Sequence, residues 1–103
     1  MRHQAWQQGG DSTVAAATTT DTDYALPTLS VGGNPRYVAV LHRGTIPVWI
    51  KFGQEGVLSD EVGFLLNGNF GAEPQKFDCG GSTYYAVTAT SGVAVVLITP
   101  LAD

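Results

Sequence analysis

The chain has 103 residues, of which 44% are hydrophobic and only 14% charged, and its formal net charge is −4. A chain of this length forms one small domain, and its five scattered basic residues argue against binding to nucleic acid or to an acidic membrane. So few charges leave much of the surface without the groups that keep small proteins soluble, which favours a partner that covers it.

Residues 1–22 consist mostly of Gln, Gly, Ala, Thr and Asp, with Met1, Trp6 and Val14 as the large apolar side chains. Such a segment buries too little apolar surface to offset its conformational entropy. We therefore predict a flexible N-terminal arm over residues 1–22 and a β-sandwich domain over residues 23–103. The start of the chain lacks a signal-peptide core, and no apolar run reaches the ~20 residues of a membrane helix.

From Tyr24 onward, short apolar runs alternate with Gly-rich and Ser-rich turns, and no helical periodicity is sustained. This pattern predicts an all-β, antiparallel sandwich of about seven strands. A jelly roll is favoured over an immunoglobulin-like sandwich because the cysteine pair of antibody domains is absent. The expected strands cover residues 24–31, 36–43, 46–52, 62–66, 75–79, 82–89 and 93–99.

Three of these strands, at 46–52, 84–89 and 93–99, carry apolar or aromatic side chains on both faces. A solvated antiparallel sheet would instead place polar residues at alternate positions. The second cover is either another copy of the chain or the chain's own loops and arm, and the pattern leaves both open. For the first alternative, the residues expected in self-association are Trp49, Lys51 and Tyr85.

The sequence contains no motif for catalysis, for a metal or for a cofactor. His3 and His42 lack zinc-like spacing, and the acidic residues at 21–23 lack the rest of a calcium loop. Cys79 is the single cysteine, so no disulfide forms within the chain. Its neighbour Asp78 disfavours the thiolate, which indicates a structural thiol rather than a nucleophile. We therefore expect a protein that is not an enzyme and that binds no cofactor.

The segments "GTIPVWIKFG" and "KFDCGGSTYYAVTATSGVAVVLITP" together resemble small structural proteins encoded among the head genes of tailed bacteriophages, and capsid decoration (cement) proteins most of all. The resemblance covers about Val31 to Leu101. It implies a β-rich virion protein, often a homotrimer, that binds the major capsid protein on the outer shell at capsomer junctions. It further implies assembly in the host cytoplasm and location on the outer capsid surface.

In that setting, the arm would reach the shell or a neighbouring subunit through Trp6, Val14, Thr18 and Thr20. Two alternatives stay open. One is a carbohydrate- or receptor-binding module of a tail or fibre, with an aromatic platform drawn from Tyr37, Trp49, Phe70 and the pair at 84–85. The other is a head-to-tail joining subunit.

Overall fold

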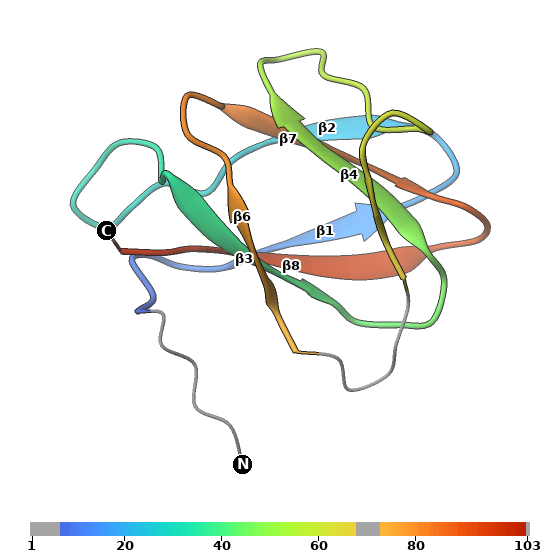
Figure 1. Cartoon of the computed structure of the whole chain (residues 1–103), viewed down its shortest axis with the longest axis horizontal. Coiled ribbons are helices and arrows are strands. Elements are labelled where there is room, and N and C mark those ends of the chain that lie inside the picture. The colour runs from blue at the N-terminus through green and yellow to red at the C-terminus, as the bar shows by residue number, and fades with distance from the viewer. Residues whose placement is uncertain (1–6, 68–72, 103) are drawn as a thin grey trace.

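A computed structural model of the chain describes residues 7–67 and 73–102, and within these residues it contains eight strands and no helix (Figure 1). Accordingly, the described residues include no helix able to cross a membrane. The strands are β1 (Thr13–Ala17), β2 (Thr22–Ala25), β3 (Tyr37–His42), β4 (Val48–Gly53), β5 (Phe64–Leu66), β6 (Gln75–Asp78), β7 (Tyr84–Ala89) and β8 (Ala94–Pro100).

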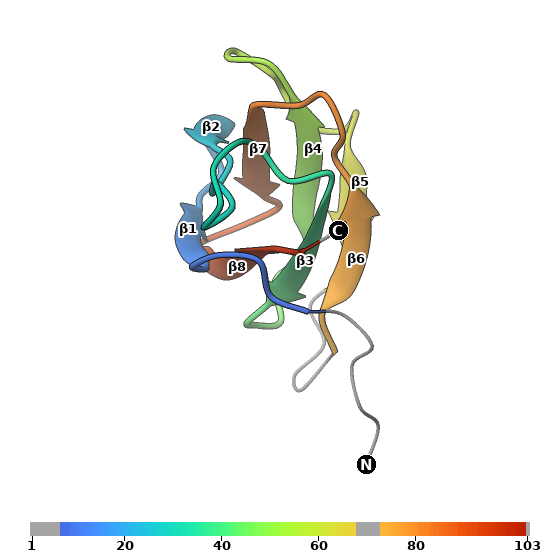
Figure 2. The same cartoon turned by 90° about the vertical axis from the view of Figure 1, so that its left-hand side faces the viewer.

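The strands form two four-stranded antiparallel sheets, in the orders β1-β8-β3-β6 and β2-β7-β4-β5. The predicted all-β, antiparallel sandwich is confirmed, although with eight strands rather than seven. Seen from the side, β1 and β2 lie along one side of the molecule and β5 and β6 along the other (Figure 2). The chain crosses between the sheets on each side.

The strand pairing is nested. The first strand pairs with the eighth, the second with the seventh, the third with the sixth and the fourth with the fifth. A long antiparallel hairpin folded over on itself has this pairing. Each sheet therefore joins segments that lie far apart along the chain.

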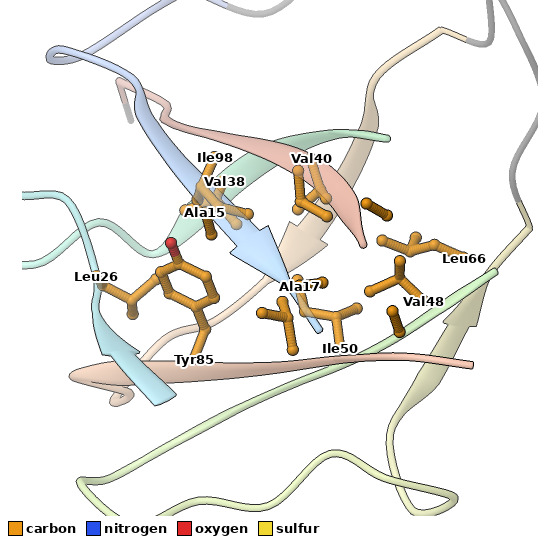
Figure 3. Close-up of a cluster of buried hydrophobic side chains, with 14 of the residues drawn as sticks. Ala15, Ala17, Leu26, Val38, Val40, Val48, Ile50, Leu66, Tyr85 and Ile98 are labelled. Atoms are coloured by element: carbon orange, nitrogen blue, oxygen red, sulfur yellow. The ribbon is translucent and has the colours of Figure 1, made fainter. Parts of the chain in front are cut away.

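The core fills the space between the two sheets. Alternation along β3 and β8 turns Val38, Val40 and Ile98 inward, and the facing sheet contributes Ile50 and Tyr85 (Figure 3). The Tyr85 side chain rises from β7 toward Ala15 of the opposite sheet (Figure 3) and is 1% exposed. These side chains lose nearly all contact with water, so their burial stabilises the sandwich.

Aromatic side chains close both open sides of the sandwich. On the side of β1 and β2, the Tyr24 and Tyr85 ring centroids are 5.7 Å apart, and the Tyr24 hydroxyl donates a hydrogen bond to the Ala16 carbonyl. On the opposite side, Phe77 of β6 contacts Phe52 and Phe64 at centroid distances of 5.7 Å and 5.2 Å. Such aromatic pairs stabilise by more than their buried area alone.

The arm predicted over residues 1–22 is not confirmed, because residues 13–17 form β1 and pair with β8 over their whole length. Ala15 and Ala17 point inward and are 1% and 0% exposed. Their methyl groups are small, but they face Tyr85 and its neighbours, where little space remains. Sequence reasoning missed β1 because alanine contributes weakly to an apolar pattern.

Residues 7–10 are also held by the body of the protein. The Gly9 amide donates a hydrogen bond to the Pro100 carbonyl, and the Ala102 amide donates one to the Gln7 carbonyl. A Cβ atom on Gly9 would lie 2.8 Å from both the Ala102 nitrogen and the Leu29 Cδ2 atom. Glycine is therefore needed at this position for the backbones to approach each other.

Candidate functional site: the two outer faces of the sandwich

The loop between β4 and β5, residues 54–63, lies on the outer side of the β2-β7-β4-β5 sheet. The Asp21 carboxylate holds it there by accepting hydrogen bonds from the Ser59 amide at 2.8 Å, the Ser59 hydroxyl at 2.9 Å and the Asp60 amide at 2.8 Å. The Asp23 carboxylate accepts a further bond from the Gly56 amide at 2.9 Å. The two carboxylates thus attach the loop to the segment at the start of β2.

The same loop covers the outward side chains of β7. Ser59 has no exposed surface, and its hydroxyl lies 2.7 Å from that of Thr88, which is 2% exposed. Ala86, the other outward residue in the middle of β7, is also buried. The sequence left open whether another copy of the chain or the chain's own loops and arm cover this strand. Within the single chain, the loop at residues 54–63 covers it.

Asp21 is a charged clamp for this loop. Partial burial raises the pKa of Asp21, but hydrogen bonds from the Asp60 and Ser59 amides and from the Thr88 and Ser59 hydroxyls outweigh it and hold the pKa below its ordinary value. Among the residues that the structure describes, no three His, Cys, Asp or Glu side chains group together to hold a metal ion.

The three residues predicted for self-association do not share one surface. Trp49 and Lys51 point outward from β4, where Trp49 is half-buried and Lys51 is exposed. Tyr85 lies in the core and has no surface to offer another copy. Its assignment to a self-association surface is therefore wrong: of two adjacent strand tyrosines only one can point inward, and in this fold it is Tyr85.

The outer face of the other sheet is apolar across three strands. Val14 of β1 lies opposite Leu97 of β8, which in turn lies opposite Leu41 of β3, and Ala16 lies opposite Val95. Val14 is 65% exposed and Val95 36%, whereas Leu41 and Leu97 are half-buried. We refer to Val14, Ala16, Leu41, Val95 and Leu97 as the β1-β8-β3 face.

Basic side chains lie along the β3 and β6 side of this face. The Arg36 guanidinium carbon lies 5.2 Å and the Lys76 ammonium 4.3 Å from the centroid of the Tyr37 ring. Both positions favour the cation–π interaction. Arg43 continues β3 at the other end, where its amide bonds to the Val95 carbonyl. Asp78 of β6 lies opposite Tyr37 of β3 and adds a carboxylate next to the basic side chains.

The four residues predicted to contact a capsid or neighbour are dispersed. Val14 lies on the β1-β8-β3 face, while Thr18 and Thr20 lie in the turn between β1 and β2. The Thr18 carbonyl accepts a hydrogen bond from the Ala89 amide, so Thr18 supports the turn. Trp6 lies outside the described residues. Sequence reasoning missed Leu41 and Leu97, because their alignment with Val14 requires the register of two distant strands.

The aromatic residues of the alternative carbohydrate platform do not converge either. Tyr37 points outward from one sheet, Trp49 and Tyr84 point outward from the other, and Tyr85 is in the core. Phe70 lies outside the described residues. Among the described residues, Tyr37 therefore does not share an aromatic surface with Trp49.

The buried thiol and imidazole have structural surroundings. Burial, followed by the negative charge of Asp78, raises the pKa of Cys79 to about 11, and its Sγ atom lies 3.5 Å from the Pro35 carbonyl oxygen. This thiol is therefore protonated and unreactive at neutral pH, as the sequence indicated. The His42 Nε2 atom bonds to the Ile46 carbonyl, and the buried Nδ1 atom has no hydrogen-bond partner among the described residues.

A hollow of about 400 Å³ lies beside the start of β1, lined by Asp11, Thr13 and residues 25–30. Asp11 is the titratable side chain of this lining. Acid–base chemistry of the glycosidase type requires a pair of carboxyl groups, and the lining does not supply one.

Comparison of the chain with protein-family models, curated proteins and solved structures finds no match.

Proposed function

We propose that this chain is a non-enzymatic virion protein, a capsid decoration protein that binds the outer shell of a tailed phage and associates with itself, as the resemblance of its last strands implies. The observation that carries the proposal is the β1-β8-β3 face. An antiparallel sheet exposed to water alternates apolar and polar positions, but here Val14, Leu97 and Leu41 place apolar side chains at outward positions of three adjacent strands. Such a face is typical of an interaction surface.

We also propose that the sandwich is a jelly roll. The nested pairing supports this assignment, since folding a long eight-stranded hairpin over produces the two sheet orders observed. Jelly rolls form viral capsid domains and lectin domains alike. A lectin-like module is supported less than a capsid-binding one, because Tyr37 and Trp49 lie on opposite faces.

Many weak contacts repeated around a shell give tight attachment through multivalency. A small apolar face on each copy is therefore sufficient for a decoration protein. A homotrimer, the state implied by the resemblance, would bring three copies of the chain to a capsomer junction.

Co-sedimentation tests the proposal, using empty shells assembled from the major capsid protein encoded by the same genome. We expect saturable binding of the purified chain, and at least about tenfold weaker binding of Val14→Glu, because the variant places a charge on the apolar face. Val31→Glu is the matched control, since Val31 is 92% exposed in the loop between β2 and β3. No binding by the unmodified chain, or equal effects of the two variants, would contradict the proposal.

A further inference from the structure

We infer that copies of this chain associate head to tail, with the β1-β8-β3 face of one copy receiving the β4–β5 loop of the next. The inference rests on the proposed function in one respect, that the chain associates with itself. It adds which two surfaces meet, and it follows from the way charge and exposed apolar side chains are divided between the two sides of the sandwich.

The side of the β1-β8-β3 face is positive. Arg36 and Arg43 flank β3 and Lys76 lies on β6 beside the Asp78 carboxylate, so these four residues carry three positive charges and one negative charge, a net charge of +2. These three residues are a majority of the chain's five basic residues.

The side that carries the loop is negative. The loop itself contributes Glu55, Asp60 and Glu61, all exposed, and Asp21 and Asp23 lie beneath it. Lys51 is the basic residue on the same side. Five negative charges against one positive charge leave a net charge of −4.

Each side also exposes apolar side chains. In the loop, Leu58 is 65% and Val62 60% exposed, next to the carboxylates of Asp60 and Glu61. On the other side, Val14 of β1 and Val95 of β8 are exposed beside β3 and β6, which carry the basic residues. Both surfaces therefore expose apolar side chains, and their net charges are opposite. A specific interface combines these two properties.

A two-fold contact does not offer this match. Two β1-β8-β3 faces brought together would oppose positive charges, and two loops would oppose carboxylates. A head-to-tail contact pairs unlike charges instead, and it produces a closed ring when the rotation between copies closes and an open chain when it does not. A trimer of this chain would then be a closed ring of such contacts.

The size of the contact sets its strength. A face of three strands by about five residues measures roughly 14 by 17 Å, or about 240 Å². This area is well below the ~800 Å² per partner of a standard interface. We therefore expect association in the micromolar to millimolar range in solution.

Sedimentation velocity across that range at low salt tests the inference with two double variants. Glu55→Lys/Asp60→Lys reverses charge on the loop, and Arg43→Glu/Lys76→Glu reverses it beside the opposite face. We expect each variant alone to associate at least about tenfold more weakly than the unmodified chain. An equimolar mixture of the two should recover association, because the loop variant keeps the unmodified β1-β8-β3 face and the other variant keeps the unmodified loop. That recovery also shows that both variants are folded.

Asp11→Lys is the control, since Asp11 is exposed outside both surfaces and its reversal should leave association unchanged. A monomeric unmodified chain at millimolar concentration overturns the inference. So does a loop variant that associates as strongly as the unmodified chain, or a mixture that does not recover. If the unmodified chain binds shells while the loop variant still self-associates normally, the inference fails and the proposed function stands.

Discussion

Replacing Asp21 by Asn tests whether one carboxylate holds the β4–β5 loop on its sheet. The side chain accepts three hydrogen bonds of 2.8 to 2.9 Å from Ser59 and Asp60. Hydrogen bonds to a charged group contribute about 1.5–3 kcal/mol each when buried, and Asp21 is only partly buried. Asn keeps one acceptor oxygen but turns an NH2 group toward the remaining donors. We expect the free energy of unfolding to fall by about 2 kcal/mol at neutral pH.

The stabilisation by Asp21 should depend on pH, and the lowered pKa of Asp21 determines in which direction. The pKa of Asp21 is lower in the folded chain than its ordinary value of 3.8. The stabilisation is therefore fully present above that value and is lost as the pH falls through the folded-state pKa. The difference between the unmodified chain and Asp21→Asn should consequently shrink at acid pH, because a protonated carboxyl group resembles the amide.

Urea denaturation followed by tryptophan fluorescence measures both free energies, and hydrogen exchange at the Gly56, Ser59 and Asp60 amides reports release of the loop. Glu55→Gln is the matched control, since it removes one charge from the same loop at an exposed position. A loss below about 0.5 kcal/mol for Asp21→Asn, or an equal loss at neutral pH and at about pH 2.5, would refute the clamp.

Three further substitutions or treatments probe the fold. Gly63→Ala should destabilise the chain by at least ~2 kcal/mol, because its Cβ atom would meet the Ile50 carbonyl and lie 2.8 Å from the carbonyl carbon. Gly44→Ala is the control in the same urea titration. The nearest neighbour of its Cβ atom would be 3.5 Å away, so its stability should change little. Tyr85→Ala should cost about 3–5 kcal/mol as a core cavity, whereas an effect near that of an exposed residue would remove Tyr85 from the core. Cys79, with its pKa raised to about 11, should react slowly with a thiol reagent at neutral pH and rapidly in urea; fast labelling of the native chain would contradict its burial.

The sequence by itself determined the class of fold and the positions of most strands. Alternating apolar runs closed by Gly-rich turns predicted β3 to β8 within a few residues, including the hairpin at residues 90–92. These signals are local, since they depend on side-chain alternation and on turn residues that lie next to each other in the chain. The neighbouring Asp78 likewise predicted that Cys79 is a structural thiol rather than a nucleophile.

Only the tertiary structure decided which side chains meet. Asp21 and Ser59 are 38 residues apart, and no local pattern predicts that one clamps the other. Alternation shows that Tyr84 and Tyr85 point in opposite directions, but the facing sheet decides which of them enters the core. The β1-β8-β3 face arises from the register of strands at opposite ends of the chain, because nested pairing places the first strand beside the last. For the same reason β1, with its small alanines, became recognisable as a strand only through its partner.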